Sequence, residues 1–475
     1  MIPLPTVVDP QHAVIDFLSH PAGYGCPTAT DVQRIETHCS LVFLVGDRAY
    51  KLKRAIRYAS LDYTTAELRE RACRAELRLN QRTAPGIYCD VWSINRSPDG
   101  MLAFNGPGPA MDFVVVMRQF AQKDLFDQLA DRGELTPDLM RALGAAIARF
   151  HVSAETMTAF GGSQAIRRVI ADNGRELALV GAMLDGIAME DLTNRSKIAV
   201  SRLGRLLDKR RAQGSVRRCH GDLRLANICL YQGQPTLFDC IEFSDEIGCI
   251  DVLYDLAFLL MDLHVRGCSD LANVVFNTYL DKTAETDGLR ALPLFLSLRA
   301  ATRSYALAGG ARRSSDKCKA ARLADLARRH IAAAAGFLVP PPPTLILLGG
   351  ADSAGRANAA NMLAGQVTPA PGARVLRLGR SGNATWREAF AVLAAGCSVL
   401  IEGMFTPADE RQALAALPLT VQLLPFWLGH LPRSLSRRVW RNLEDRDSAI
   451  AAVASALPLA ATGRVDAQLF NNGSH

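Results

Sequence analysis

The chain has 475 residues, of which 49% are hydrophobic and 21% charged, and its formal net charge is +7. This composition excludes a disordered chain, and the length is enough for roughly two or three folded domains. The lysines and arginines are scattered in short clusters, which argues against a nucleic-acid partner; anionic phosphorylated ligands explain the mild positive excess equally well.

The cysteines and the apolar stretches indicate a cytoplasmic protein. The 11 cysteines include no Cys-x-x-Cys pair, and their odd number argues against a complete disulfide framework, so we expect buried free thiols. The sequence starts without the basic flank and apolar run of a signal peptide, and its most apolar stretches, such as 256–263, are far too short to span a bilayer. No membrane partner is expected.

The first predicted strands carry two lysines. A short amphipathic helix over 10–20 precedes a strand-like segment at 34–46, and a hairpin turn then leads into a second strand at 48–54. Because side chains alternate along a strand, Lys51 and Lys53 lie on one face. Ala49-Tyr50-Lys51 also fits the kinase strand Val-Ala-Ile-Lys, whose lysine pairs with nucleotide phosphates. The strand alone favours solvated surface lysines, but the motif downstream makes either lysine a candidate.

A kinase lysine of this type needs a carboxylate from a nearby helix. A helix is predicted over 64–82, from the N-cap Thr64 to the stop at Pro85. Its candidate carboxylates are Glu67, Glu70 and Glu76. Glu76 lies closest to the apolar side, so we predict that it positions the lysine; an ordinary helix-face carboxylate is the alternative.

Strands and then helices follow. Strands are predicted at 87–94 and 112–120, the second of them buried by its continuous apolar run. From about residue 122 the pattern is helical, with helices at 124–132 and 137–151 and an arginine-rich helical stretch at 164–213. The second helix is capped by Thr136, and its last residue, His151, is predicted to pack rather than to catalyse.

The segment 220–263 carries the side chains that phosphoryl transfer needs. Asp222 and Asn227 have the spacing of the kinase catalytic loop H-R-D-x-x-x-x-N, and Asp239 follows the apolar run 236–238. In such a site one carboxylate takes the proton of the attacking hydroxyl, while a carboxylate and an amide hold magnesium on the phosphates. We therefore predict Asp222 as the base, with Asn227 and Asp239 as magnesium ligands. An acidic loop without catalytic function is the alternative.

His220-Gly-Asp-x-x-x-x-Asn227, Asp239 and Tyr254-Asp255-Leu-Ala together resemble the aminoglycoside phosphotransferase and choline kinase group of small-molecule kinases. More closely, the chain resembles bacterial two-domain proteins in which such a kinase is fused to a P-loop ATP-binding domain. The resemblance implies that His220 braces the catalytic loop and that Asp255 supports it.

The resemblance bears on further positions. Glu76-Leu-Arg-Leu-Asn80 matches a segment that recurs in the two-domain group. By the order of the fold, Met117 to Phe120 would form the hinge between two lobes, where adenine binds through backbone groups. The group usually has His where this chain has Arg224, so the loop geometry or the contact with the acceptor is expected to differ.

The rest of the first domain is mostly helical from 251 to 336. From Leu294 to Arg303 one side of the pattern is apolar, and Arg299 and Arg303 lie on the other. Two carboxylates just past Asp239 either face the metal or substrate or are solvated: Glu242 and Asp245.

The C-terminal domain resembles a P-loop kinase that has lost its chemistry. A buried strand at 344–350, a Gly-rich turn and a helix at 356–364 give the context of a P-loop, but Arg356 and Ala357 replace its lysine and hydroxyl residue. Glu402 ends a second, acidic strand, and the arginine-rich 433–446 resembles a lid. We predict an inactive domain kept for stability, for regulation or for a homodimer; weak nucleotide binding without turnover is the alternative.

The predicted fold is an α+β, protein-kinase-like bilobal domain followed by an α/β P-loop-like domain. Its parts are a β-rich lobe at 1–121, a helical lobe at 122–337, a Pro-rich linker at 338–343 and the P-loop-like domain at 344–475.

The predicted function is magnesium-dependent transfer of the γ-phosphate of ATP, or of GTP, to a hydroxyl of a small alcohol or sugar-like substrate. One alternative is an inactive pseudokinase that binds nucleotide or acts as a scaffold. Another, a working kinase in the C-terminal domain, is disfavoured by Arg356 and Ala357. No acidic cluster strong enough to indicate a polycationic antibiotic is visible.

Overall fold

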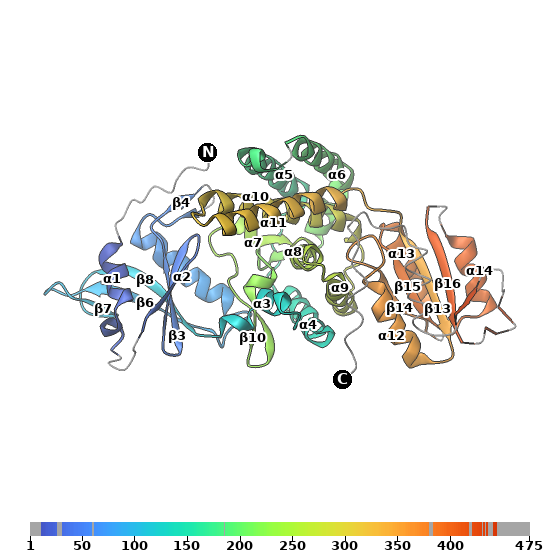
Figure 1. The fold of residues 1–475 in the computed structure, drawn as a ribbon, viewed down its shortest axis with the longest axis horizontal. Helices are drawn as coiled ribbons and strands as arrows, with labels where there is room; N and C mark the ends of the chain where they lie inside the picture. Colours follow the sequence, from blue (N-terminus) through green and yellow to red (C-terminus); the bar gives the residue numbers. More distant parts are fainter. Residues whose placement is uncertain are drawn as a thin grey trace. The chain divides into compact units, whose positions relative to one another are not determined.

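The computed structural model describes residues 11–25, 31–58, 61–184, 186–379, 383–417, 420–429, 431–432, 434–435 and 440–443. The chain divides into two compact units, Met1–Val339 and Pro340–His475, and the boundary falls at the start of the polyproline segment. Each unit has its own sheet (Figure 1). Every helix in the described part of the chain is too short or too polar to cross a membrane.

Unit 1 begins with a six-stranded antiparallel sheet in the order β1-β2-β3-β8-β6-β7. Its strands are β1 (Gln33–Glu36), β2 (Ser40–Val45), β3 (Arg48–Lys53), β6 (Tyr88–Arg96), β7 (Leu102–Phe104) and β8 (Ala110–Arg118). Two short strands, β4 (Arg57–Tyr58) and β5 (Leu61–Asp62), pair with each other. The central β8 is buried, as its apolar run predicts.

Alternation along β8 places one helix on each face of this sheet. Val114 and Val116 belong to the apolar cluster that includes α1 (His12–Ser19), whereas Phe113 and Val115 belong to the cluster that includes Cys73 of α2 (Ala66–Asn80). On the side of the sheet that α2 covers, Lys51 and Lys53 of β3 meet Glu76 of that helix.

Three local predictions for this lobe need correction. The strand expected at 34–46 is two strands, because Thr37 turns the chain by donating its backbone N–H to Ser40 O at 2.9 Å. The helix expected from Thr64 begins at Ala66, and its cap is Thr65, whose hydroxyl accepts from the backbone of Leu68. The strand β7 was not predicted.

The second part of unit 1 is helical. Its helices are α3 (Phe126–Asp131), α4 (Pro137–Ser153), α5 (Gly162–Leu179), α6 (Gly186–Ala212), α7 (Asp245–Gly248), α8 (Val252–Val265), α9 (Ser269–Thr283), α10 (Leu292–Arg313) and α11 (Lys317–Phe337). Two small antiparallel sheets pair β9 (Val216–Arg218) with β12 (Cys249–Asp251) and β10 (Ile228–Tyr231) with β11 (Gln234–Leu237), and the second of them is a hairpin. The catalytic loop runs from β9 to β10, beside the buried α8.

The expectation that Arg299 lies on a polar face of its helix is wrong. Arg299 is buried, with its guanidinium carbon 3.9 Å from the ring centroid of Tyr254 and 4.7 Å from that of Phe258. The aromatic faces and the carbonyl of Tyr254, which accepts from Nε at 3.1 Å, stabilise the cation in the core.

Unit 2 contains a five-stranded parallel sheet in the order β14-β15-β13-β16-β17. Its strands are β13 (Thr344–Gly350), β14 (Arg374–Arg377), β15 (Val399–Gly403), β16 (Gln422–Leu428) and β17 (Arg441–Leu443), and its helices are α12 (Ser353–Ala364), α13 (Asn383–Ala394) and α14 (Pro407–Ala416). The first helix begins at Ser353 rather than at 356, because Asp352 caps it by accepting from Ala354 N at 3.0 Å. Most of the predicted lid at 433–446 lies outside the described residues.

Candidate active site

Lys51 lies at the meeting point of the two lobes. Its Nζ is 2.7 Å from Oε1 of Glu76 on α2 and 2.6 Å from Oδ1 of Asp239, which follows β11. Of the three candidate carboxylates on α2, Glu76 is therefore the one that reaches the lysines, and its side chain is fully buried. The three residues come from the sheet, its helix and the loop after the helical lobe's hairpin.

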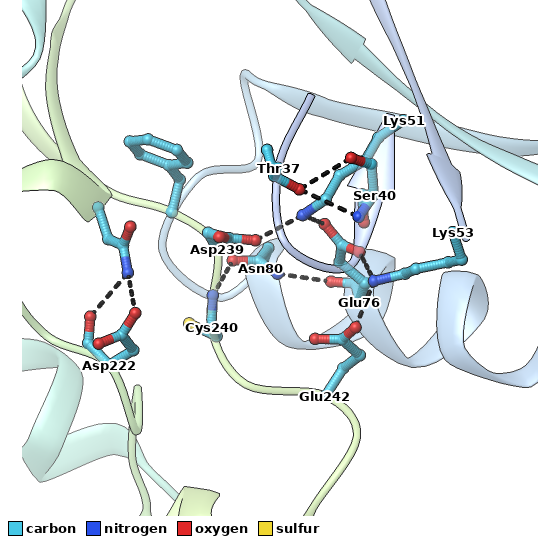
Figure 2. A network of polar contacts seen from close by, with 12 residues as sticks. Thr37, Ser40, Lys51, Lys53, Glu76, Asn80, Asp222, Asp239, Cys240 and Glu242 are labelled. Atoms are coloured by element: carbon cyan, nitrogen blue, oxygen red, sulfur yellow. Dashed lines mark hydrogen bonds and ion pairs between the residues drawn. The ribbon is translucent and has the colours of Figure 1, made fainter. Parts of the chain in front are cut away.

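Lys53 occupies a different environment on the same face of β3. Its Nζ pairs with the second carboxylate oxygen of Glu76 and with Glu242. Figure 2 shows Glu76 between the two lysines, with Glu242 on the far side of Lys53. The side chain of Lys53 is 2% exposed and that of Lys51 is 12% exposed, so Lys51 is the better placed of the two to reach a ligand.

Glu242 is a buried structural partner rather than a solvated loop carboxylate. Besides Lys53, it accepts a hydrogen bond from the hydroxyl of Tyr63 at 2.6 Å. Asp245, by contrast, is an exposed carboxylate that pairs with Arg218 at 2.6 Å. Of these two residues, only Glu242 contributes to the network around the lysines.

The charges of this network hold one another in the ionised form. Burial alone would lower the pKa of Lys51, but Asp239 and Glu76 raise it well above its usual value. Burial would raise the pKa of Asp239, but Lys51 brings it down to about 2. Glu76 is likewise shifted, since the two lysines lower its pKa against the effect of burial. At neutral pH the site therefore holds two ammonium groups among carboxylates.

The catalytic loop arranges Asp222 and Asn227 against each other. Asn227 ends a single helical turn, Leu225–Asn227, and its Nδ2 donates to the backbone O of Asp222 at 2.9 Å and to its Oδ2 at 2.7 Å. Arg224 adds a contact that the motif did not predict: its Nε lies 3.1 Å from both carboxylate oxygens of Asp222. Asp222, the predicted base, therefore forms an ion pair with Arg224 in this structure.

Asp255 holds the start of the loop from within α8. Its two oxygens accept from the backbone N–H groups of His220, at 3.0 Å, and Gly221, at 2.9 Å. Gly221 has a φ of 86°, in the left-handed region where glycine avoids the strain of a side chain. His151, predicted as a packing residue, is buried and contacts Asp255 Oδ2 at 3.1 Å.

The backbone of the Asp239 segment is tied to both lobes. Asp239 has a φ of 63°, and its N–H donates to the hydroxyl of Tyr88 at 3.2 Å. The next N–H, of Cys240, donates to Oδ1 of Asn80 at 2.8 Å, and Nδ2 of Asn80 donates to the carbonyl of Glu76 at 2.9 Å. Asn80 thereby links α2 to the Asp239 segment, which gives a structural reason for the asparagine at the end of Glu76-Leu-Arg-Leu-Asn80.

The other predicted site residues are His220, Met117 and Phe120. His220 Nε2 lies 2.9 Å from the carbonyl of Phe238, so this buried side chain braces the segment before Asp239. Met117 lies in β8, and Phe120 packs its ring against Phe238 with a centroid distance of 5.1 Å. The assignment of Met117 to Phe120 as the adenine hinge stays a prediction. The sequence did not predict the contacts of four further residues of this network: Tyr63, Tyr88, Arg224 and Glu242.

The donor set fits a magnesium ion. Asn227 uses its Nδ2 on Asp222, which leaves the amide oxygen for a metal. Asp239 uses Oδ1 on Lys51 but has a side chain that is 42% exposed, which leaves Oδ2 accessible. Carboxylate and amide oxygens are the hard donors that magnesium prefers.

A lysine, carboxylates and an amide arranged in this way are typical of a phosphotransferase site. Residues 101–292 match the model of the phosphotransferase enzyme family. The matched region contains Asp222, Asn227 and Asp239, but it begins after the strand and the helix that carry Lys51 and Glu76. The match supports a phosphotransferase and leaves the acceptor open.

Particular proteins resemble the chain as well. An uncharacterized protein of Mycobacterium tuberculosis is 31% identical over 273 residues, which are 57% of this chain and 53% of that protein. An uncharacterized protein of Mycobacterium bovis matches to the same extent. The chain thus spans about half the length of the curated relatives it matches, as these shares show.

Two solved structures are similar at low identity. A choline kinase from Cryptosporidium parvum is 12% identical with a TM-score of 0.43, over 68% of this chain and 93% of that chain. A putative aminoglycoside phosphotransferase from Ralstonia eutropha is 12% identical with a TM-score of 0.41, over 65% of this chain and 92% of that chain.

The two lysines should respond differently to replacement. Lys51→Met is expected to lower kcat/KM for ATP by about 10- to 100-fold, because a charge-assisted hydrogen bond contributes about 1.5–3 kcal/mol. Lys53→Met should act first on stability, because it leaves the buried Glu242 without its cation. Steady-state kinetics with varied ATP, together with thermal unfolding, separates the two. A normal melting curve with the larger loss of ATP affinity in Lys53→Met would reverse the assignment.

Proposed function

We propose that unit 1 is a small-molecule kinase that transfers the γ-phosphoryl group of ATP to a hydroxyl of a small alcohol or sugar-like acceptor. One observation carries the proposal: Lys51 is held at 2.7 Å by Glu76 and at 2.6 Å by Asp239, two residues far apart in sequence. The hydrogen-bonded pair of Asp222 and Asn227 and the family match over 101–292 support it.

Each residue has a defined role in this reaction. Asp222 accepts the proton as the acceptor oxygen bonds to the γ-phosphorus and the bond to the departing ADP oxygen breaks. Lys51 binds the phosphates, and Glu76 fixes its ammonium. Asn227 and Asp239 provide oxygen ligands for magnesium, which when bound offsets the negative charge of the phosphates. The backbone between Met117 and Phe120 is the proposed adenine contact.

Nucleotide binding without transfer is the second candidate, and the contact of Arg224 with Asp222 favours it. Both carboxylate oxygens of Asp222 face the guanidinium at 3.1 Å, so the base must separate from Arg224 before it can accept a proton. Replacement by the family's usual residue tests this: an Arg224→His variant that gains turnover from an inactive wild type would favour the second candidate.

Unit 2 is proposed to be a P-loop-like domain without catalysis. Arg356, at the position of the P-loop lysine, is buried; it donates to the carbonyl of Gly350 and lies 3.5 Å from Oε2 of Glu402. Arg377 pairs with the other oxygen of Glu402 at 2.8 Å. The group that should reach a phosphate is thus turned onto the domain's own strands, which supports a structural function for this unit.

Magnesium-dependent ATP turnover with a panel of small alcohols, sugars and aminoglycosides tests the proposal. Asp239→Ala should abolish turnover because it removes a metal ligand and the partner of Lys51. Arg356→Ala should leave turnover unchanged while lowering the stability of unit 2, since it breaks the contact with Glu402.

The opposite pattern moves the chemistry to unit 2: turnover lost in Arg356→Ala alone. Nucleotide binding without turnover across the whole panel favours the second candidate. If neither the wild type nor Lys51→Met binds nucleotide, both candidates are contradicted.

A further inference from the structure

Arg224 lies on the open side of the catalytic loop. Buried and partly exposed residues alternate there: Leu223 and Leu225 are buried in the core, whereas Asp222 and Arg224 are partly exposed. The backbone of Arg224 is extended, with a φ of −141°, and extended residues two apart share a face. The side chain of Arg224 is 22% exposed and that of Asp222 is 25% exposed. The arginine is therefore on the same side of the loop as the predicted base.

The guanidinium of Arg224 has donors that Asp222 does not use. Its Nε lies 3.1 Å from each carboxylate oxygen of Asp222, which is its side-chain partner among the residues that the structure describes. An arginine also carries N–H groups on Nη1 and Nη2. In Arg224 neither of these atoms donates to a described residue, and neither belongs to the buried side-chain atoms that lack a partner. Both are therefore open to solvent beside the loop.

The charged groups behind the loop are committed to one another. On α8, Asp262 accepts from the backbone N–H of Leu225 at 3.1 Å and pairs with Arg266 at 3.2 Å. Arg266 in turn pairs with Asp131 of α3 at 2.8 Å. These residues balance one another without Arg224, so its contact with Asp222 is the interaction that a ligand must replace.

The proposed reaction brings a phosphoryl group close to this guanidinium. Asp222 takes the proton of the acceptor hydroxyl, whose oxygen attacks the γ-phosphorus from about 3–3.5 Å. The γ-phosphoryl group then lies roughly two hydrogen-bond lengths from the carboxylate that Arg224 already contacts. Lys51 is on β3 of the other lobe, and the corresponding lysine of kinases pairs with the α- and β-phosphates. Arg224 is thus the cation placed to reach the γ-phosphate.

We propose that Arg224 binds the γ-phosphoryl group of ATP, so that nucleotide binding draws the arginine away from Asp222 and releases the base. This inference rests on the proposed kinase function. Guanidinium groups bind phosphates through paired hydrogen bonds, and an ion pair that is partly open to solvent costs little to separate. In the transition state the arginine then stabilises the negative charge spread over the phosphoryl oxygens.

Calorimetric titration of the full chain with magnesium tests the proposal without an identified acceptor. The probes are ADP and a non-hydrolysable ATP analogue, which differ in the γ-phosphate. In Arg224→Met the ratio of the affinity for the analogue to that for ADP should fall about tenfold or more, because a hydrogen bond to a charged group is lost. The affinity for ADP itself should stay unchanged.

Two further variants assign the effect to the guanidinium. Arg224→Lys should keep part of the preference for the analogue, because it retains the charge but not the paired geometry. The control Arg132→Met removes an exposed arginine of the same lobe, which pairs with Glu134 at 2.7 Å, and should leave the ratio intact.

Turnover distinguishes this function from simple inhibition of the base. With an active acceptor, Arg224→Met should lower kcat by about 10²- to 10³-fold, the usual effect of removing a donor to developing charge. An arginine that only blocks Asp222 would give the opposite sign, with a kcat that rises in Arg224→Met.

An unchanged affinity ratio in Arg224→Met would overturn the inference, as would a higher kcat or an equal loss of affinity for ADP and the analogue. If the wild type binds both nucleotides and one of these results is obtained, the kinase proposal still stands. A wild type that binds neither nucleotide would instead contradict the kinase proposal and the inference together.

Discussion

Replacing Asp222 with asparagine should lower kcat by about 10²- to 10⁴-fold, the usual contribution of a general base. The amide keeps the size of the side chain, and its oxygen can still accept from Asn227, which now donates to Oδ2 at 2.7 Å. What it cannot do is take the proton of the attacking hydroxyl. KM for ATP should change little, because the phosphates contact Lys51 and not Asp222 in the proposed arrangement.

Steady-state kinetics with magnesium, ATP and an active acceptor measures this effect. Asp245→Asn is the matched control, since it neutralises an exposed carboxylate of the same lobe that pairs with Arg218. A kcat for Asp222→Asn within about tenfold of the wild-type value would remove Asp222 from the role of base. A normal kcat with a raised KM for the acceptor would make it a binding residue.

Replacing Asp255 with alanine should lower the free energy of unfolding of unit 1 by about 3–5 kcal/mol, the scale for breaking a buried charged network. The fully buried carboxylate accepts from the backbone of His220 and Gly221 and contacts His151. Its loss leaves these donors without a partner in the core and frees the start of the catalytic loop. Activity should fall together with stability.

The contribution of Asp255 should also depend on pH. Burial would raise its pKa, but the hydrogen bond and charge of His151 hold it at about 2, below the value of about 3.9 in an unfolded chain. A lowered folded-state pKa means that the stabilisation is complete above about pH 4 and is lost as the pH falls toward 2.

Chemical denaturation of wild type and Asp255→Asn at several pH values checks this. The difference between their unfolding free energies should be constant near neutrality and should shrink below about pH 4. A difference that grows with acidity would contradict the pKa direction, and an Asp255→Ala protein as stable as wild type would contradict the supporting role itself.

Local signals were enough to locate much of the site. Asp222 and Asn227 come from one loop, and their spacing alone predicted that they act together; the structure links them by hydrogen bonds. The hairpin at Gly46-Asp47 formed as expected between β2 and β3, because a glycine in the left-handed region, here with a φ of 59°, needs no distant contact. Such features depend on neighbours in sequence.

Local sequence patterns did not predict the positions of charged side chains that are buried in the folded chain. Arg299 looked like a polar-face residue because an arginine in a helix is usually solvated, and only the rings of Tyr254 and Phe258 explain its place in the core. For the same reason the sequence is compatible with Glu242 either in solvent or in the site, and its contacts with Lys53 and Tyr63 place it in the buried network. The type of a charged residue does not by itself predict which distant side chains will neutralise it in the fold.

The order of residues along the chain was enough to predict the chemical groups of the candidate site: a carboxylate as base, an amide and a second carboxylate, with two lysines on one strand face upstream. The different partners of Lys51 and Lys53, the choice of Glu76 among the glutamates of α2 and the contact of Arg224 with Asp222 appear only in the folded structure. Alternation along a strand makes the two lysines equivalent. Both contact Glu76, but Asp239, 188 residues from Lys51, and Glu242, 189 residues from Lys53, make them different, because charge and burial are set by what packs nearby in space.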